Sequence, residues 1–69
     1  MKKLFEVVDE RGHPTMIPFH RVVRVVKCTS QWTYAPAVIF EMDGGTQIAI
    51  PVQEGEVAWG AYREWVESL

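Results

Sequence analysis

The chain has 69 residues and a net charge of −2, and 48% of its residues are hydrophobic, including three Trp, three Phe and two Tyr. A chain of this length buries only about 60% of its unfolded surface, which excludes a second domain, and 1–69 is therefore predicted to be one domain. The single cysteine, Cys28, excludes an internal disulfide and favours a reducing compartment. No apolar stretch has the length of a signal peptide or a membrane span, so we expect a cytoplasmic protein without a membrane partner.

The first half of the chain is predicted to form strands. Residues 4–8 mix β-branched and aromatic residues, a turn containing Gly and Pro follows, and 15–18 can form a short returning strand. That strand is an edge or an end, because Pro18 lacks a backbone N–H. Residues 19–28 carry four valines, which strongly favour a strand. This strand has apolar residues on both faces. Either both faces are buried, or a bend near His20–Arg21 changes which residues point to each face, and we favour the bend.

The second half combines a hairpin with a helix. Residues 37–42 are predicted to be a strand, and Asp43-Gly44-Gly45 then marks a tight hairpin turn, because Gly adopts positive φ without steric cost. Residues 46–52 alternate between two faces, which is typical of a strand with one buried face. Apolar residues recur with helical period from Val57 to Leu69, and Gly55 is the expected N-cap.

The predicted fold class is therefore α+β. We expect a small antiparallel sheet of four to five strands with one C-terminal amphipathic helix packed on one face. The helix is short, so it needs the sheet to hold it.

Residues that could support catalysis or metal binding are scattered. His13, His20 and Cys28 do not show the spacing of a zinc site, and the serines have no recognisable base or oxyanion-hole motif. The Gly-rich segment 43–46 lacks the Lys and the following helix of a phosphate-binding loop. We therefore expect no enzyme, no cofactor and no metal, and we expect Cys28 to be a small buried residue.

Large aromatic residues mark the candidate protein-interaction site. Trp32 and Tyr34 lie in a predicted polar loop at 29–36, and Trp59 lies at the edge of the apolar face of the helix. Trp and Tyr are favoured anchors of protein interfaces. The alternative is that the loop closes the open end of the core, in which case its aromatic side chains are structural.

Basic residues mark an alternative site. Arg21, Arg24 and Lys27 form one patch only if their strand bends, and basic sheet faces bind single-stranded nucleic acid in some small folds. Charge is also segregated, with six basic and three acidic residues in 1–28 against one basic and six acidic residues in 41–69. Such asymmetry indicates a self-association surface or a polar partner. The alternative is that these charges face one another within one small fold.

The order of the segments resembles that of the small bacterial FlbD-like proteins. The resemblance covers residues 16–69 and is carried by Arg24-Val25-Val26, the run from Val38 to Gly45, Ile48-Ala49-Ile50-Pro51-Val52 and the closing helix. Those proteins pass through short strands, a glycine hairpin after an aliphatic strand, a further aliphatic strand and a terminal helix. The Trp-rich helix and the Trp32–Tyr34 loop depart from that layout. The resemblance implies a small cytoplasmic accessory protein without established catalytic residues.

These observations predict a non-enzymatic protein-interaction or accessory domain. Surplus aromatic residues, segregated charge and a prolyl sheet edge favour self-association, most simply as a homodimer. The alternative is a small nucleic-acid-binding regulator that uses the basic strand.

Overall fold

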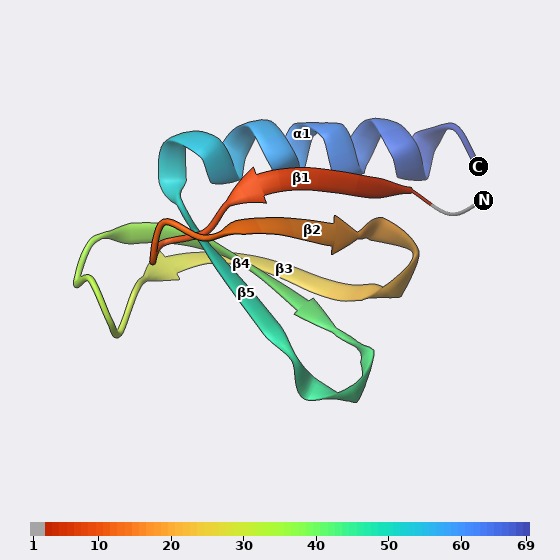
Figure 1. Cartoon of the computed structure of the whole chain (residues 1–69). Coiled ribbons are helices and arrows are strands. Elements are labelled where there is room, and N and C mark those ends of the chain that lie inside the picture. Colours follow the sequence, from red (N-terminus) through yellow and green to blue (C-terminus); the bar gives the residue numbers. More distant parts are fainter. Residues whose placement is uncertain (1–2) are drawn as a thin grey trace.

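The computed structural model describes residues 3–69, in which five strands precede a long helix (Figure 1). The elements are β1 (Leu4–Val8), β2 (Pro14–Pro18), the 3₁₀ turn η1 (Phe19–Arg21), β3 (Val22–Thr29), β4 (Pro36–Met42), the 3₁₀ turn η2 (Asp43–Gly45), β5 (Gln47–Pro51) and α1 (Val52–Glu67). None of the helices in this part of the chain is long and apolar enough to cross a membrane.

The strands form two antiparallel sheets, whereas the sequence predicted one. β1 pairs with β2, and β3, β4 and β5 form a three-stranded sheet in that order. The α+β class and the C-terminal helix are confirmed. The prediction of a single sheet of four to five strands was wrong, because the chain does not continue the ladder from β2 to β3.

Proline explains why the sheet divides between β2 and β3. The N–H of Phe19 donates to the carbonyl of Lys3 at 2.9 Å. Since hydrogen-bonded and non-hydrogen-bonded pairs alternate in an antiparallel ladder, the odd-numbered residues of β1 and β2 bond to each other. In that alternation the backbone groups of Pro14, Met16 and Pro18 point away from β1. Since proline has no N–H, Met16 offers the one donor on that edge, too few for a ladder with β3.

The bend predicted near the start of the valine-rich strand is confirmed, and it has two parts. The turn η1 redirects the chain immediately before β3 and buries Phe19. The pairing with β4 then shifts by one residue between Val22 and Arg24, which leaves Val23 as an extra residue that is 66% exposed. The shift lets Val25 pack against the core while Arg24 faces solvent.

The hairpin predicted between β4 and β5 is also confirmed. Gly44 and Gly45 have φ of +81° and +92°, values that cost residues with a Cβ and suit glycine. The N–H of Met42 donates to the carbonyl of Thr46 at 2.8 Å and closes the turn.

The helix begins at Val52, earlier than the predicted start at Val57. Pro51 is the N-cap, and its φ of −52° ends the strand and leads directly into the helix. Gly55, the predicted N-cap, instead lies inside α1 and is buried. The prediction placed a strand as far as Val52 and a helix only from Val57, whereas the intervening residues form the first turn of the helix.

The far end of the helix also differs from the prediction. The predicted helical pattern runs to Leu69, but α1 ends at Glu67 and Leu69 is 72% exposed. Beyond the helix, the regular spacing that would turn Leu69 toward the core no longer applies.

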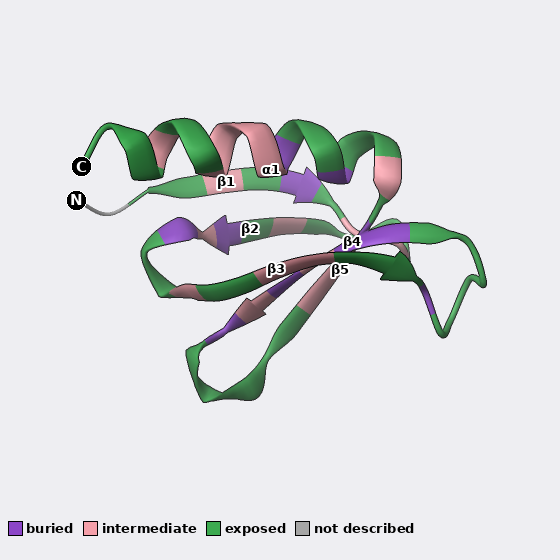
Figure 2. Cartoon of the chain, turned by 180° about the vertical axis from the view of Figure 1, so that it is seen from behind, coloured by how far each residue is buried: buried purple, intermediate pink, exposed green. Residues whose placement is uncertain are grey.

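The core lies between the β1–β2 hairpin, the inner face of the three-stranded sheet and α1 (Figures 1 and 2). Phe19 is at its centre and stacks on Phe5 at 5.4 Å between ring centroids. Tyr62 and Trp65 of α1 contact the same ring at 5.3 and 6.1 Å. Burying one such side chain stabilises the fold by about 1.5–3 kcal/mol. The aromatic residues of the helix therefore serve mainly to attach it to the sheets.

Candidate interaction surface along strand β3

β3 has a free edge, because it is a terminal strand of its sheet. The N–H of Ser30 donates to the carbonyl of Ala35 at 2.8 Å, which places the hydrogen bonds between β3 and β4 at the even-numbered residues of β3. Pro36, opposite Thr29, fits this alternation because it has no N–H to donate. The backbone groups that point away from β4 belong to Val25, Lys27 and Thr29.

Among the described strands, β3 alone has no buried residue (Figure 2). The six candidate site residues from the sequence all lie on or near it. Arg21 precedes it, Arg24 and Lys27 belong to it, Trp32 and Tyr34 follow it, and Trp59 lines a hollow beside Lys27. An edge strand without a buried residue is accessible to a partner.

The solvent-facing side of the β3-β4-β5 sheet forms a shallow hollow of about 360 Å³. Val26, Ile39 and Ala49 pair across the three strands and give it an apolar floor. Cys28 and Trp32 lie at the end nearest the β3–β4 loop. Cys28 is exposed, so the expectation of a small buried residue was wrong. Its side chain points to the solvent-facing side, as do those of Arg24 and Val26.

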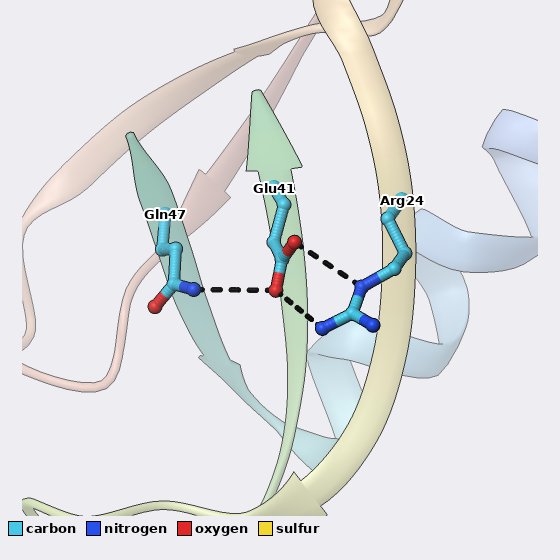
Figure 3. Close-up of polar contacts among 3 residues, drawn as sticks. All are labelled: Arg24, Glu41 and Gln47. Atoms are coloured by element: carbon cyan, nitrogen blue, oxygen red, sulfur yellow. Dashed lines mark hydrogen bonds and ion pairs between the residues drawn. The ribbon is translucent and has the colours of Figure 1, made fainter. Parts of the chain in front are cut away.

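A row of polar side chains crosses the other end of this hollow (Figure 3). The Arg24 guanidinium donates to both carboxylate oxygens of Glu41, from Nε at 3.1 Å and from Nη2 at 2.8 Å. Gln47 donates from Nε2 to Glu41 Oε2 at 3.2 Å. The hydrogen bond to Glu41 raises the pKa of Arg24 above its ordinary value. The row holds one residue from each strand in a fixed arrangement.

The loop between β3 and β4 is organised by Ser30, which is 3% exposed. Its Oγ accepts the N–H groups of Trp32 and Thr33, both at 3.1 Å. The same hydroxyl donates to the Glu10 carboxylate, and the Arg11 guanidinium lies 5.2 Å from the centre of the Trp32 ring. The β1–β2 turn therefore holds the loop in place.

The aromatic residues of this loop lie at the surface. Trp32 is 55% exposed and Tyr34 is 83% exposed, and neither belongs to the buried core. The alternative in which the loop closes the core with these side chains is not what the structure shows. Tyr34 has a φ of +58°, so its backbone is in a conformation that residues with a Cβ rarely adopt.

Trp59 lies on the opposite side of β3 from Trp32. It is half-buried against the core, and it lines a hollow of about 310 Å³ together with Lys27, Glu56 and Arg63. The Lys27 ammonium is 2.8 Å from Glu56 Oε1, and this hydrogen bond lowers the pKa of Glu56. The Arg63 guanidinium lies 4.6 Å from the centre of the Trp59 ring.

All three candidate nucleic-acid-binding residues are paired with carboxylates. Arg21 contacts Asp43 at 2.8 Å, and the pairs of Arg24 and Lys27 are described above. The basic first half and the acidic second half of the chain thus neutralise each other within the fold.

The structure does not bring Trp32, Tyr34 and Trp59 together on one face. Trp32 and Trp59 line separate hollows on the two sides of β3, and the strand is what they share. Sequence reasoning missed Ser30 and Glu10, which shape the loop. Ser30 follows the end of β3, and its hydroxyl binds the N–H groups two and three residues later. A serine in this position is a local signal that could have indicated the turn.

No group of three or more His, Cys, Asp or Glu side chains within residues 3–69 could hold a metal ion. In comparisons with known proteins, no family model matches the chain, and no curated protein or solved structure is significantly similar to it. The resemblance to FlbD-like proteins therefore stays a prediction.

Proposed function

We propose that this protein is a non-catalytic interaction domain that forms a homodimer through the free edge of β3. The observation that carries this proposal is an exposed, unpaired strand edge with a tryptophan-lined hollow on each side. Unpaired strand edges are templates for the addition of a further strand. The second copy of β3 supplies a strand of matching length and β propensity.

Geometry favours one register for this pairing. Two antiparallel copies of β3 must exchange hydrogen bonds between odd-numbered residues, since those groups point outward. Centring the pair on Val26 sets Val26 opposite its own copy and Lys27 opposite Val25. Centring it on Lys27 would set two ammonium groups directly opposite each other, which is unfavourable. Centring it on Val25 would set Lys27 opposite Val23, in the irregular segment, and would leave Val25 opposite its own copy as the one regular hydrogen-bonded pair.

Charge neutralisation supports self-association as well. Arg24 and Lys27, the charged residues of β3, are each held by a carboxylate of the same chain. Two copies can therefore approach along this edge without a net repulsion between basic side chains.

Disulfide trapping tests the register. In the proposed dimer the two Val26 positions form a non-hydrogen-bonded pair, with about 4.5 Å between Cα atoms, within the range of a disulfide. We expect the variant Cys28→Ser with Val26→Cys to be trapped as a covalent dimer under mild oxidation. The matched control, Cys28→Ser with Val57→Cys, places an exposed thiol on α1 and should remain largely monomeric on a denaturing gel.

Light scattering gives the independent measurement. The unmodified protein should have twice the monomer mass at concentrations of about 100 μM, which is typical of a modest interface. A monomer at that concentration contradicts the proposal. A dimer that Val26→Cys does not trap more efficiently than Val57→Cys contradicts the assignment to β3.

A further inference from the structure

Another open strand edge belongs to β1, which is a terminal strand of its sheet. The N–H of Phe19 donates to the carbonyl of Lys3, and the N–H of Asp9 donates to the carbonyl of His13 at 3.0 Å. These bonds mark the two ends of the ladder with β2, so the odd-numbered residues of β1 carry its hydrogen bonds. The backbone N–H and C=O groups that point away from β2 belong to Leu4, Glu6 and Val8.

This outward row continues to Glu10, where it meets β5. The N–H of Glu10 donates to the carbonyl of Ala49 at 3.0 Å. Pairing stops there, because the chain passes Pro51 and enters α1, which runs alongside β1 (Figure 1). A helix bonds its backbone groups internally and offers none to a neighbouring strand. The single hydrogen bond from Glu10 to Ala49 therefore does not continue as a ladder along β1, whose outward backbone groups have no strand opposite them.

A hollow of about 480 Å³ lies between the open edge and the helix. It is lined by Phe5, Glu6, Val7, Val8 and Pro14 together with Glu54 and Val57 of α1. Glu6 and Val8 share one face of β1 with Pro14 of β2, which pairs with Val8, so the hollow lies against this outer face of the hairpin and reaches the open edge of β1. Val8 and Val57 are 50% and 67% exposed, which leaves apolar surface available on both sides.

The charged residues that line this hollow are acidic. Glu6 and Glu54 line it, and neither forms an ion pair with another side chain of residues 3–69. A second copy of β1 is a poor occupant, because full antiparallel overlap would set Glu6 directly opposite its own copy. An occupant with a Lys or Arg opposite Glu6 would instead gain a favourable cross-strand pair.

We propose that the free edge of β1 accepts an extended segment of a partner protein as an added strand. The segment carries a Lys or Arg opposite Glu6 and apolar residues two positions to either side, opposite Leu4 and Val8. Main-chain hydrogen bonds to the outward row supply the affinity, and the alternating side chains supply the specificity. This site is separate from β3, so it stands or falls independently of the dimer.

Peptide titration followed by amide NMR tests the proposal. The probe is the capped peptide acetyl-Thr-Val-Thr-Lys-Thr-Val-Thr-amide, and the expected shifts are at the amides of Leu4, Glu6 and Val8. Replacing its Lys by Glu should weaken binding about fivefold, because an attraction becomes a repulsion beside two carboxylates. Methylating its backbone nitrogens on the bonding side should abolish binding, since the ladder loses its donors.

Two charge-reversal variants of the protein test whether Glu6 sets the preference for a basic peptide. Glu6→Lys should reverse the preference, so that the Glu peptide binds more tightly than the Lys peptide. The matched control Glu64→Lys alters an exposed carboxylate of α1 outside the hollow and should leave the preference unchanged.

Four results would overturn the proposal. They are the absence of shifts at millimolar peptide, shifts that map to β3 instead of β1, equal binding of the methylated peptide, and equal binding of the Lys and Glu peptides. Concentration-dependent shifts at Leu4 and Val8 without any peptide would show that a second copy occupies the edge, which also overturns it.

Discussion

Gly55 of α1 lies so close to Val38 of β4 that a Cβ on Gly55 would be 2.6 Å from Val38 Cβ and 2.7 Å from Val38 Cγ2. The carbonyl oxygen of Ile50 would be 3.3 Å from the same atom. The absence of a side chain at Gly55 therefore allows the first turns of the helix to lie directly on the central strand of the sheet.

The close approach predicts opposite effects for two glycines of the same helix. Gly55→Ala should destabilise the protein by about 1–3 kcal/mol, because overpacking against Val38 outweighs the gain in helix propensity. Gly60→Ala should stabilise it by about 0.5–1 kcal/mol, since no atom lies within 4 Å of the added Cβ. Urea denaturation of both variants measures the difference. Equal effects at the two positions would show that Gly55 is not confined by β4.

The hydrogen bonds of the Ser30 hydroxyl lead us to expect that this residue holds the β3–β4 loop in place. Ser30→Ala removes the acceptor of two backbone N–H groups and the donor to Glu10, and it should cost about 1–2 kcal/mol. Thr33→Ala is the control in the same loop, because its hydroxyl accepts one exposed bond at 3.3 Å. Hydrogen exchange at Trp32 and Thr33 should accelerate in the Ser30 variant. Unchanged exchange there would contradict this role.

The hydrogen bonds of the Asp9 carboxylate lead us to expect that the folded protein loses stability in acid. The backbone N–H groups of His13 and Arg11 donate to its carboxylate and hold its pKa below the ordinary value in the folded state. The unfolded chain then binds the proton more readily, so the stabilisation is present above about pH 4 and is lost as the pH falls through the folded pKa. Denaturation between pH 6 and pH 2.5 should show a steeper loss in the wild type than in Asp9→Asn. Parallel pH profiles would exclude this contribution.

Cys28 reports on the proposed dimer without any substitution, because it is exposed and is the only cysteine of the chain. A bulky maleimide on its sulfur should lower the dimer fraction, since the proposed register sets Cys28 opposite Arg24 of the second copy. Methylthiolation adds far less volume and is the matched control. Light scattering of both adducts gives the comparison, and a maleimide adduct that dimerises as well as the control would contradict the β3 pairing.

The sequence by itself determined the local elements whose chemistry is short-range. The two glycines after Asp43 require positive φ, so the hairpin was predictable, and the run of valines indicated β3. Pro18 indicated a sheet edge for the same local reason, because the missing N–H belongs to the residue itself. The three loop and helix aromatics were identified as candidates, although their positions relative to one another were not.

Tertiary structure decided the features that depend on what lies opposite each residue. The close approach of Gly55 to Val38, which lets the first turns of α1 lie on the central strand, is contained in no local pattern. Arg24 and Lys27 of β3 meet carboxylates that are distant in sequence, each at 2.8 Å, which the sequence alone did not specify. The strand order decides that β1 and β3 are terminal strands, and the hydrogen-bond alternation in each ladder decides which of their backbone groups point outward.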